Sequence, residues 1–176
     1  MKEYKELGQM RAVNGESLQG HEIKYYLPHH AVLRPESTTT KLRVVFDGSA
    51  KSTSGQSLND ILLIGPTVQQ DLLSLVLRFR LHRIGITADI EKMYRQVWIH
   101  PEHRSLQCIL WRENFEVQPA TLQLNTIKYG TAAAPFLATR CLKEISENVK
   151  DSNPIAGLVI ANNFYVDDMI TCASAS

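Results

Sequence analysis

Two adjacent carboxylates, Asp167 and Asp168, lie in the tetrapeptide Tyr165-Val166-Asp167-Asp168, and this feature constrains the fold most. The apolar runs on either side, residues 160–165 and 169–171, are typical of short strands, which predicts a hairpin with the acidic pair at its tip. Strand alternation alone would send the two carboxylates to opposite faces, whereas a tight turn relaxes that constraint. Such a pair can bind a metal ion, although two Asp residues also suit an ordinary solvated turn.

A third carboxylate ends a second predicted strand. Residues 84–90 form an apolar, β-favouring run with one acidic residue, Asp89, where the strand is expected to stop. Carboxylates at the ends of neighbouring strands converge on one edge of a sheet, and their oxygens are the ligands that Mg²⁺ prefers. Asp89, Asp167 and Asp168 are therefore candidates for a site that holds two metal ions about 3.5–4 Å apart for phosphoryl transfer.

Other segments of the sequence are less regular. The sequence predicts a polar, irregular segment over residues 1–40 and a strand over residues 41–47, with further strands over residues 97–99, 106–111 and 122–129. A helix is expected over residues 68–83, begun by a capping box between Thr67 and Gln70, with a core stripe of Leu72, Val76 and Phe79. A second helix is expected over residues 133–149, with the stripe Leu137, Cys141, Ile145 and Val149.

An ordered set of motifs resembles the fingers and palm of reverse transcriptases, in particular those of Pao/BEL-type LTR retrotransposons. The Tyr165–Asp168 tetrapeptide resembles the family's Tyr-X-Asp-Asp catalytic turn. The other matching segments follow in the family's order at residues 41–48, 57–60, 88–97 and 129–136, and residues 25–30 and 38–41 point to the Pao/BEL type. Each motif is weak alone, but the ordered set makes a specific resemblance over residues 22–173.

The resemblance implies an α+β fold: a fragment of a polymerase palm and fingers, with an antiparallel sheet packed on helices and the thumb absent. It implies an N-terminal arm over residues 1–40, fingers and the first palm helix over residues 41–83, and the palm with the catalytic carboxylates over residues 84–176. Residues 169–176 alone follow the acidic pair. We therefore expect that this truncated domain cannot hold a primer by itself.

The resemblance also implies an RNA-directed DNA polymerase that transfers deoxynucleotides, with Mg²⁺ or alternatively Mn²⁺ as cofactor. Its partners would be dNTPs, an RNA or DNA template with a DNA primer, and the rest of a retroelement polyprotein. The metal ions would be held by Asp89, Asp167, Asp168 and the backbone carbonyl of Ile90. Nucleotide contacts would come from Lys41, Arg43, Ile90, Tyr94, Tyr129 and Gly130.

Several of these nucleotide contacts have a structural alternative. Lys41 and Arg43 share one face of the strand over residues 41–47, where a guanidinium can bind phosphate bidentately, or where charges can simply discourage pairing of an edge strand. In the family, the aromatic at the position of Tyr94 excludes a ribose 2′-OH by a steric clash, whereas an aromatic just past a strand is commonly core. The small residues from Gly130 onward leave room for a base pair or for a tightly packed helix start.

The composition predicts one intracellular domain, cytoplasmic or nuclear. No apolar run reaches the roughly 18–20 residues of a membrane span, and no signal peptide is evident. Cys108, Cys141 and Cys172 lack Cys-x-x-Cys spacing, so we expect buried thiols. The net charge of +1 lacks the basic excess common in nucleic-acid binders, but a carboxylate-rich site would offset basic grooves.

Two alternatives belong to other classes of function. The first is a catalytically inactive retroelement remnant that acts as a nucleic-acid-binding or interaction module. The second is a fragment that does not fold stably alone, because a missing subdomain would leave apolar strand edges exposed.

Overall fold

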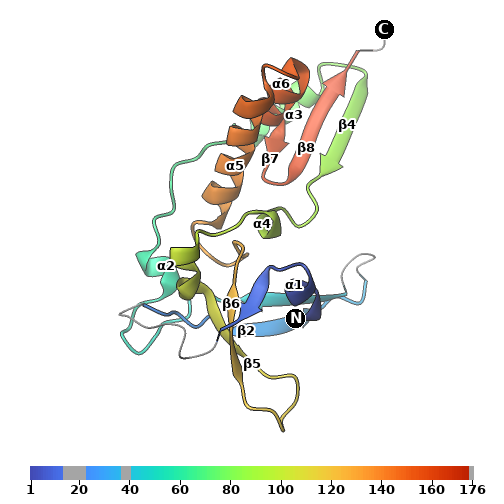
Figure 1. Ribbon diagram of the computed structural model, residues 1–176. Coiled ribbons are helices and arrows are strands. Elements are labelled where there is room, and N and C mark those ends of the chain that lie inside the picture. The colour runs from blue at the N-terminus through green and yellow to red at the C-terminus, as the bar shows by residue number, and fades with distance from the viewer. Residues whose placement is uncertain (14–22, 37–40, 175–176) are drawn as a thin grey trace. The chain divides into compact units, whose positions relative to one another are not determined.

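The computed structural model describes residues 1–13, 23–36 and 41–174, and Figure 1 shows its helices and strands. Residues 38–40, part of the segment that points to the Pao/BEL type, lie outside the described residues. The chain divides into two compact units. Unit 1 comprises Met1–Leu63 and Tyr94–Ala134, and unit 2 comprises Ile64–Met93 and Pro135–Ser176.

Antiparallel strands build unit 1. One sheet has the strand order β1-β6-β5, and β2 pairs with β3 in a second. The strands are β1 (Met10–Ala12), β2 (His29–Leu33), β3 (Leu42–Phe46), β5 (Cys108–Trp111) and β6 (Ala120–Leu124). The helical elements are α1 (Lys2–Glu6), α2 (Leu58–Ile61) and a 3₁₀ helix over Pro101–Gln107, and α4 (Met93–Gln96) lies where the chain passes from unit 2 to unit 1.

The N-terminal segment, for which the sequence predicts an irregular arm, contributes to the core of unit 1. Met10 is 3% exposed and Leu27 is 2% exposed. Both belong to an apolar cluster that also contains Phe46, Leu58, Ile109, Leu122 and Leu124. Full burial of such a side chain is worth about 1.5–3 kcal/mol. The prediction of an irregular arm is therefore wrong for β1 and β2, which pair with strands from later in the chain.

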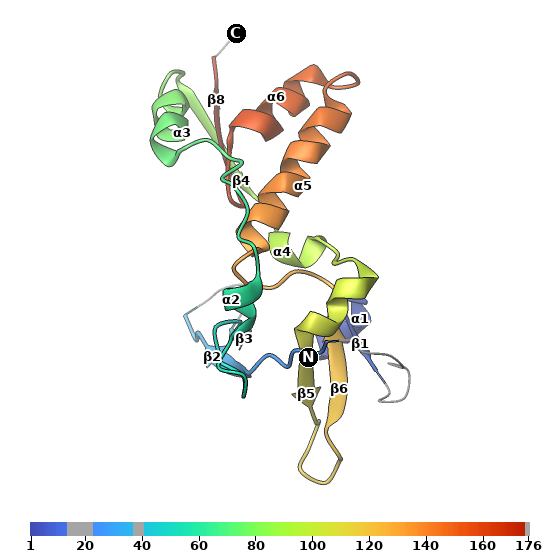
Figure 2. The ribbon, with the colours of Figure 1, turned by 90° about the vertical axis from the view of Figure 1, so that its left-hand side faces the viewer.

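Unit 2 combines one antiparallel sheet with three helices. Its strands, β4 (Ile84–Asp89), β7 (Phe164–Tyr165) and β8 (Asp168–Ala173), have the order β4-β8-β7. The helices are α3 (Leu72–Phe79), α5 (Ala134–Val149) and α6 (Pro154–Asn162). Figure 2 shows α3 on one side of this sheet and α5 and α6 on the other. On the α3 side the packing is close, because a Cβ added at Gly85 would lie 2.6 Å from the ring of Phe79.

The helix expected over residues 68–83 is shorter than predicted. α3 begins at Leu72, and its N-cap is Asp71, whose side chain accepts a hydrogen bond of 2.9 Å from the Ser74 N–H. Asp is among the preferred N-cap residues, and the helix begins after Asp71 and not after Thr67, the predicted cap. Leu75 is the fully buried residue of the helix, whereas Leu72 is 44% exposed, so the predicted core stripe is displaced.

The first half of the run of residues 160–165, predicted as a strand, belongs to a helix. Asn153 caps α6 by accepting from the Ala156 N–H, and Pro154 occupies the first helical position, where its missing N–H costs nothing. The helix continues to Asn162, and β7 retains only Phe164 and Tyr165. The hairpin is confirmed, but its first strand is two residues long.

Three other strand predictions need correction. Residues 97–99 form no strand and contribute one isolated bridge, between Trp98 and Thr126. Residues 106–107 belong to the 3₁₀ helix, so the strand predicted from residue 106 begins at Cys108. The strand predicted over residues 122–129 is β6, which ends at Leu124.

The helix predicted over residues 133–149 is confirmed as α5, but its buried face carries Ala138, Thr139 and Ser146. The predicted stripe instead places Leu137 and Ile145 where they are 38% and 47% exposed.

Candidate active site

The acidic tetrapeptide forms the tight turn that its sequence predicts. Tyr165 pairs with Asp168 across the β7–β8 hairpin, which leaves Val166 and Asp167 as a two-residue loop. Val166 has a φ of +57°. Tight hairpins with positive φ at the first loop position favour glycine there, and a non-glycine residue in this region costs about 1–3 kcal/mol. The chain therefore stores backbone strain next to its acidic pair.

The register of the sheet brings the three carboxylate-bearing positions together. Asp89, the last residue of β4, is the direct cross-strand partner of Asp168, the first residue of β8. Direct partners project from the same face, with Cβ atoms about 4.5–5.5 Å apart. The Ile90 N–H donates a hydrogen bond of 3.0 Å to the backbone oxygen of Asp167, which ties the turn to the end of β4.

These positions suit a cation by their chemistry. Asp89 and Asp168 are exposed and Asp167 is half-buried. Like charges directly opposite each other on paired strands are destabilising, and a divalent cation would offset that repulsion. Within the described residues, however, no group of three His, Cys, Asp or Glu side chains is arranged to hold a metal ion. The carbonyl of Ile90 accepts from the Met93 N–H at 3.2 Å, which leaves one lone pair for a ligand.

A glutamine that the motifs do not include contacts the same turn. The Val166 N–H donates to Oε1 of Gln69 at 2.8 Å, and Nε2 of Gln69 approaches the Val166 carbonyl oxygen at 3.4 Å. Gln69 lies in the segment before α3, some hundred residues away in sequence, and is half-buried. Its signal in the sequence is weak, because a lone glutamine before a helix is commonly a surface residue.

The predicted phosphate contacts lie in unit 1. Lys41 directly precedes β3, Arg43 lies on it, and both side chains are exposed. Alternation places Arg43 and Val45 on the face opposite buried Phe46, as predicted. Among the residues that the structure describes, neither cation forms an ion pair.

The predicted nucleotide aromatics also lie in unit 1 and contact each other. The ring centroids of Tyr94 and Tyr129 are 4.3 Å apart, with the planes inclined by 59°. Tyr94 is 6% exposed, as expected if it is a core residue, whereas Tyr129 is 54% exposed. Aromatic pairs at this spacing stabilise each other by about 0.5–1.5 kcal/mol. The pair thus presents one accessible ring on a buried support.

Gly130 is required by the fold itself. Its φ is +97°, and an added Cβ would lie 2.2 Å from the backbone oxygen of Phe46. The Asn59 side chain fixes the same segment: it donates to the Gly130 oxygen at 3.0 Å and accepts from the Ala132 N–H at 2.8 Å. The close neighbour of Gly130 here is thus the end of β3, which is the packing alternative. A nucleotide contact at Gly130 stays a prediction.

A buried lysine precedes this segment. Lys128 is 2% exposed, its Nζ donates to Oγ1 of Thr126 at 2.7 Å, and it lies 4.6 Å from the ring centroid of Tyr4. The Arg95 guanidinium lies 4.1 Å from the same ring. Burial, with a further contribution from Arg95, lowers the pKa of Lys128 to about 7. Sequence patterns give no indication of this cluster.

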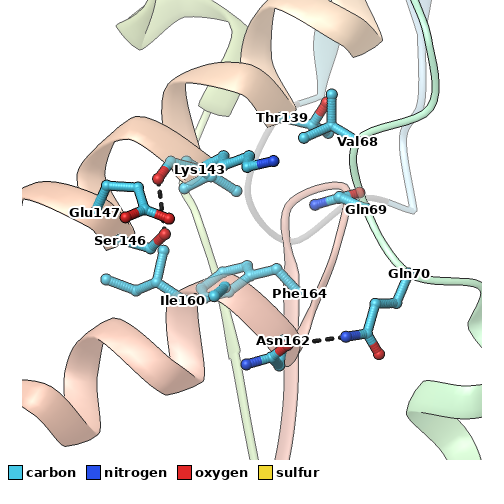
Figure 3. A pocket seen from close by; sticks show the side chains of 12 residues that line it. Val68, Gln69, Gln70, Thr139, Lys143, Ser146, Glu147, Ile160, Asn162 and Phe164 are labelled. Carbon is cyan, nitrogen blue, oxygen red and sulfur yellow. Dashed lines mark hydrogen bonds between the residues drawn. The ribbon is translucent and has the colours of Figure 1, made fainter. Parts of the chain in front are cut away.

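Unit 2 also contains a small cavity, shown in Figure 3. The segment before α3, helices α5 and α6, and Phe164 of β7 line it. Its volume of about 230 Å³ is below the roughly 300–1,000 Å³ of common ligand pockets. Gln70 bridges its rim by donating to Oδ1 of Asn162 at 2.8 Å. We therefore interpret the cavity as a small packing space next to Phe164 of β7, and not as a substrate site.

The thiols partly match their prediction. Cys108 is buried, whereas Cys141 and Cys172 are half-buried, and none of the three forms a disulfide within the described residues. Burial raises the pKa of the Cys141 thiol, which lowers its reactivity at neutral pH. Within the described residues, no helix is both long and apolar enough to cross a membrane.

Comparison with known proteins identifies the fold. A scan against protein-family models finds no match, and a search of curated protein sequences finds none. A search of solved structures finds the crystal structure of a prototype foamy virus protease-reverse transcriptase, with a TM-score of 0.67 and 16% sequence identity. The match covers 99% of this chain and 19% of that chain, so this chain spans about one fifth of that protein's length. The described fold is that of a reverse-transcriptase-like domain.

Proposed function

We propose that this chain is the fingers and palm of a retroelement reverse transcriptase, of the Pao/BEL type, and that it transfers deoxynucleotides to a primer under the direction of an RNA or DNA template. The observation that carries the proposal is the pairing of β4 with β8, which places Asp89 directly opposite Asp168. The backbone oxygen of the turn residue Asp167 also accepts a hydrogen bond from the Ile90 N–H. This arrangement occurs within a fold like that of a reverse transcriptase. Fold alone does not imply function, so the carboxylates and not the fold carry the argument.

The carboxylates would hold Mg²⁺, with Mn²⁺ as a substitute. Asp89 and Asp167 would be its main ligands, with Asp168 and the carbonyl of Ile90 completing the set. When bound, the ions supply an acidified primer 3′-OH and charge neutralisation on the triphosphate. The donor set is all oxygen and lies at strand ends, which is the ligand chemistry that Mg²⁺ prefers. In the described residues the three side chains are not already arranged around an ion, so the proposal rests on the backbone register.

The remaining roles fall to residues of unit 1. Arg43, and to a lesser extent Lys41, would bind the triphosphate and offset the charge that develops on the leaving phosphates. Tyr94, braced by Tyr129, would lie under the sugar and exclude a 2′-OH. In this proposal residues 41–83 supply the fingers and the first palm helix, and residues 84–176 the palm. The thumb and any further activities would belong to the rest of a polyprotein.

The test is incorporation of a single dNTP on an RNA template with a DNA primer by the 176-residue chain. Template–primer is titrated to the highest attainable concentration, so that weak binding does not hide incorporation. We expect Mg²⁺-dependent incorporation that Asp167→Asn abolishes while circular dichroism shows an unchanged fold. Equal incorporation by that variant would contradict the catalytic assignment.

The same assay decides between the proposal and the inactive remnant. A folded chain that binds template–primer but adds no nucleotide at saturation would be better described as a nucleic-acid-binding module. Exposed Lys41 and Arg43 are equally compatible with that outcome, because a nucleic-acid backbone offers the same phosphate groups as a triphosphate. Loss of incorporation on Asp89→Asn, by contrast, would separate catalysis from binding.

A further inference from the structure

The acidic turn has a backbone that must be held in place. Val166 is β-branched and has a φ of +57°, a combination that is rare without support from the surrounding structure. Its two neighbours in the turn region, Asp167 and Asp168, carry the carboxylates. A change in the φ and ψ of Val166 would therefore alter the direction of the chain that follows it, and with it the placement of Asp167 and the start of β8 at Asp168.

Gln69 supplies a bridge to that residue. Its amide accepts from the Val166 N–H at 2.8 Å and donates to the Val166 oxygen over a longer 3.4 Å. Both polar groups of one backbone residue thus meet one side chain. A side-chain amide can pair with the N–H and the C=O of one backbone residue, since it carries an acceptor and a donor on one planar group.

A second tether acts on the next residue. The Ile90 N–H donates to the Asp167 oxygen at 3.0 Å, so the turn is held by the end of β4 and by Gln69. The neighbouring Gln70 has a different task. Its amide donates to Asn162 at the end of α6 and accepts from Arg78 of α3, as its orientation toward Asn162 in Figure 3 illustrates.

We propose that Gln69 is a positioning residue of the active site, which holds the strained Val166 turn and thereby keeps Asp167 and Asp168 next to Asp89 at the end of β4. The proposal rests on the proposed function, because the carboxylates need this placement only if they bind a cation together. In this proposal Gln69 acts without contact to substrate or metal ion. Its effect passes through the backbone of Val166.

The first measurement is independent of activity. Amide hydrogen exchange at Val166 is compared in the unmodified chain, in Gln69→Met and in Gln70→Met, the matched control of equal size and neighbouring position. The loss of one hydrogen bond predicts exchange at Val166 about tenfold faster in Gln69→Met and unchanged in Gln70→Met. Unchanged exchange in Gln69→Met, or an equal rise in both variants, would overturn the proposal.

The second measurement asks whether the turn matters to the carboxylates. Mn²⁺ affinity is determined by electron paramagnetic resonance on the same three proteins and on Asp167→Asn. We expect Gln69→Met to bind Mn²⁺ about tenfold more weakly than Gln70→Met. Equal affinity of those two variants would overturn the positioning role. Equal affinity of Asp167→Asn and the unmodified chain would instead overturn the proposed metal site, and exchange at Val166 distinguishes this failure from that of Gln69.

Discussion

Lys128 gives the stability of unit 1 a specific dependence on pH. The residue is 2% exposed, and its ammonium group lies close to Thr126, the ring of Tyr4 and the Arg95 guanidinium. Burial lowers its pKa from 10.5 to about 7 in the folded chain. The unfolded chain, with its ordinary pKa, therefore binds more protons at Lys128 between these two values, so the free energy of unfolding rises with pH across that window.

The magnitude follows from the two pKa values. Below pH 7 the folded chain carries the full cost of the buried charge, and above pH 10.5 it carries none. Each pKa unit corresponds to about 1.4 kcal/mol, so the whole effect approaches about 5 kcal/mol. At pH 7, close to the pKa in the folded chain, about half of the folded molecules have already lost the Lys128 proton. Between pH 7 and pH 9 the free energy of unfolding is therefore expected to rise by about 2 kcal/mol.

The perturbation is Lys128→Met, which keeps the length of the side chain and removes its charge. Urea unfolding is measured at pH 7, 8 and 9 for the unmodified chain, for this variant and for Lys2→Met, whose side chain is 90% exposed. We expect the stability of Lys128→Met, taken relative to the unmodified chain, to fall by about 2 kcal/mol from pH 7 to pH 9. A constant difference, or the same trend in Lys2→Met, would refute the assignment of this pH dependence to Lys128.

Three further substitutions test the local geometry by thermal unfolding. Asp89→Asn should stabilise the chain by about 0.2–1 kcal/mol in the absence of divalent cations, because it removes a like charge directly opposite Asp168, and a loss of stability would contradict that register. Gly130→Ala should destabilise by more than about 2 kcal/mol, since its Cβ would meet the oxygen of Phe46 at a φ of +97°. Asn59→Leu should cost about 1–3 kcal/mol through the unpaired backbone groups that it leaves, and an effect within experimental error would show that water replaces the amide.

The strand ends around the carboxylates could be predicted from sequence because local signals determine them. The apolar run before Asp89 ends in an acidic residue, and β4 ends there. The turn at residues 166–167 is set by a two-residue loop between short β-favouring segments. The start of α6 also has a local signal, because Asn153 and Pro154 form a standard helix start. The β-branched residues before Phe164 favour a strand, however, and a strand is predicted there.

The contacts that complete the candidate site could not be predicted in this way. The pairing of Asp89 with Asp168 depends on the register of two strands about 80 residues apart, and a shift of one residue would have placed them on opposite faces. The bond from Val166 to Gln69 joins two segments that share no pattern. Burial of Lys128 contradicts the usual preference of lysine for the surface, and cation–π contact with Tyr4 accounts for part of it.

Paramagnetic broadening by Mn²⁺ tests the central claim most directly, because it locates a cation in the folded chain without requiring turnover. In an amide nuclear magnetic resonance spectrum titrated with Mn²⁺, we expect the signals of Ile90 and Asp168 to broaden first in the unmodified chain and to persist in Asp167→Asn. Broadening centred elsewhere, or equal broadening in that variant, would contradict a cation site formed by the three carboxylates.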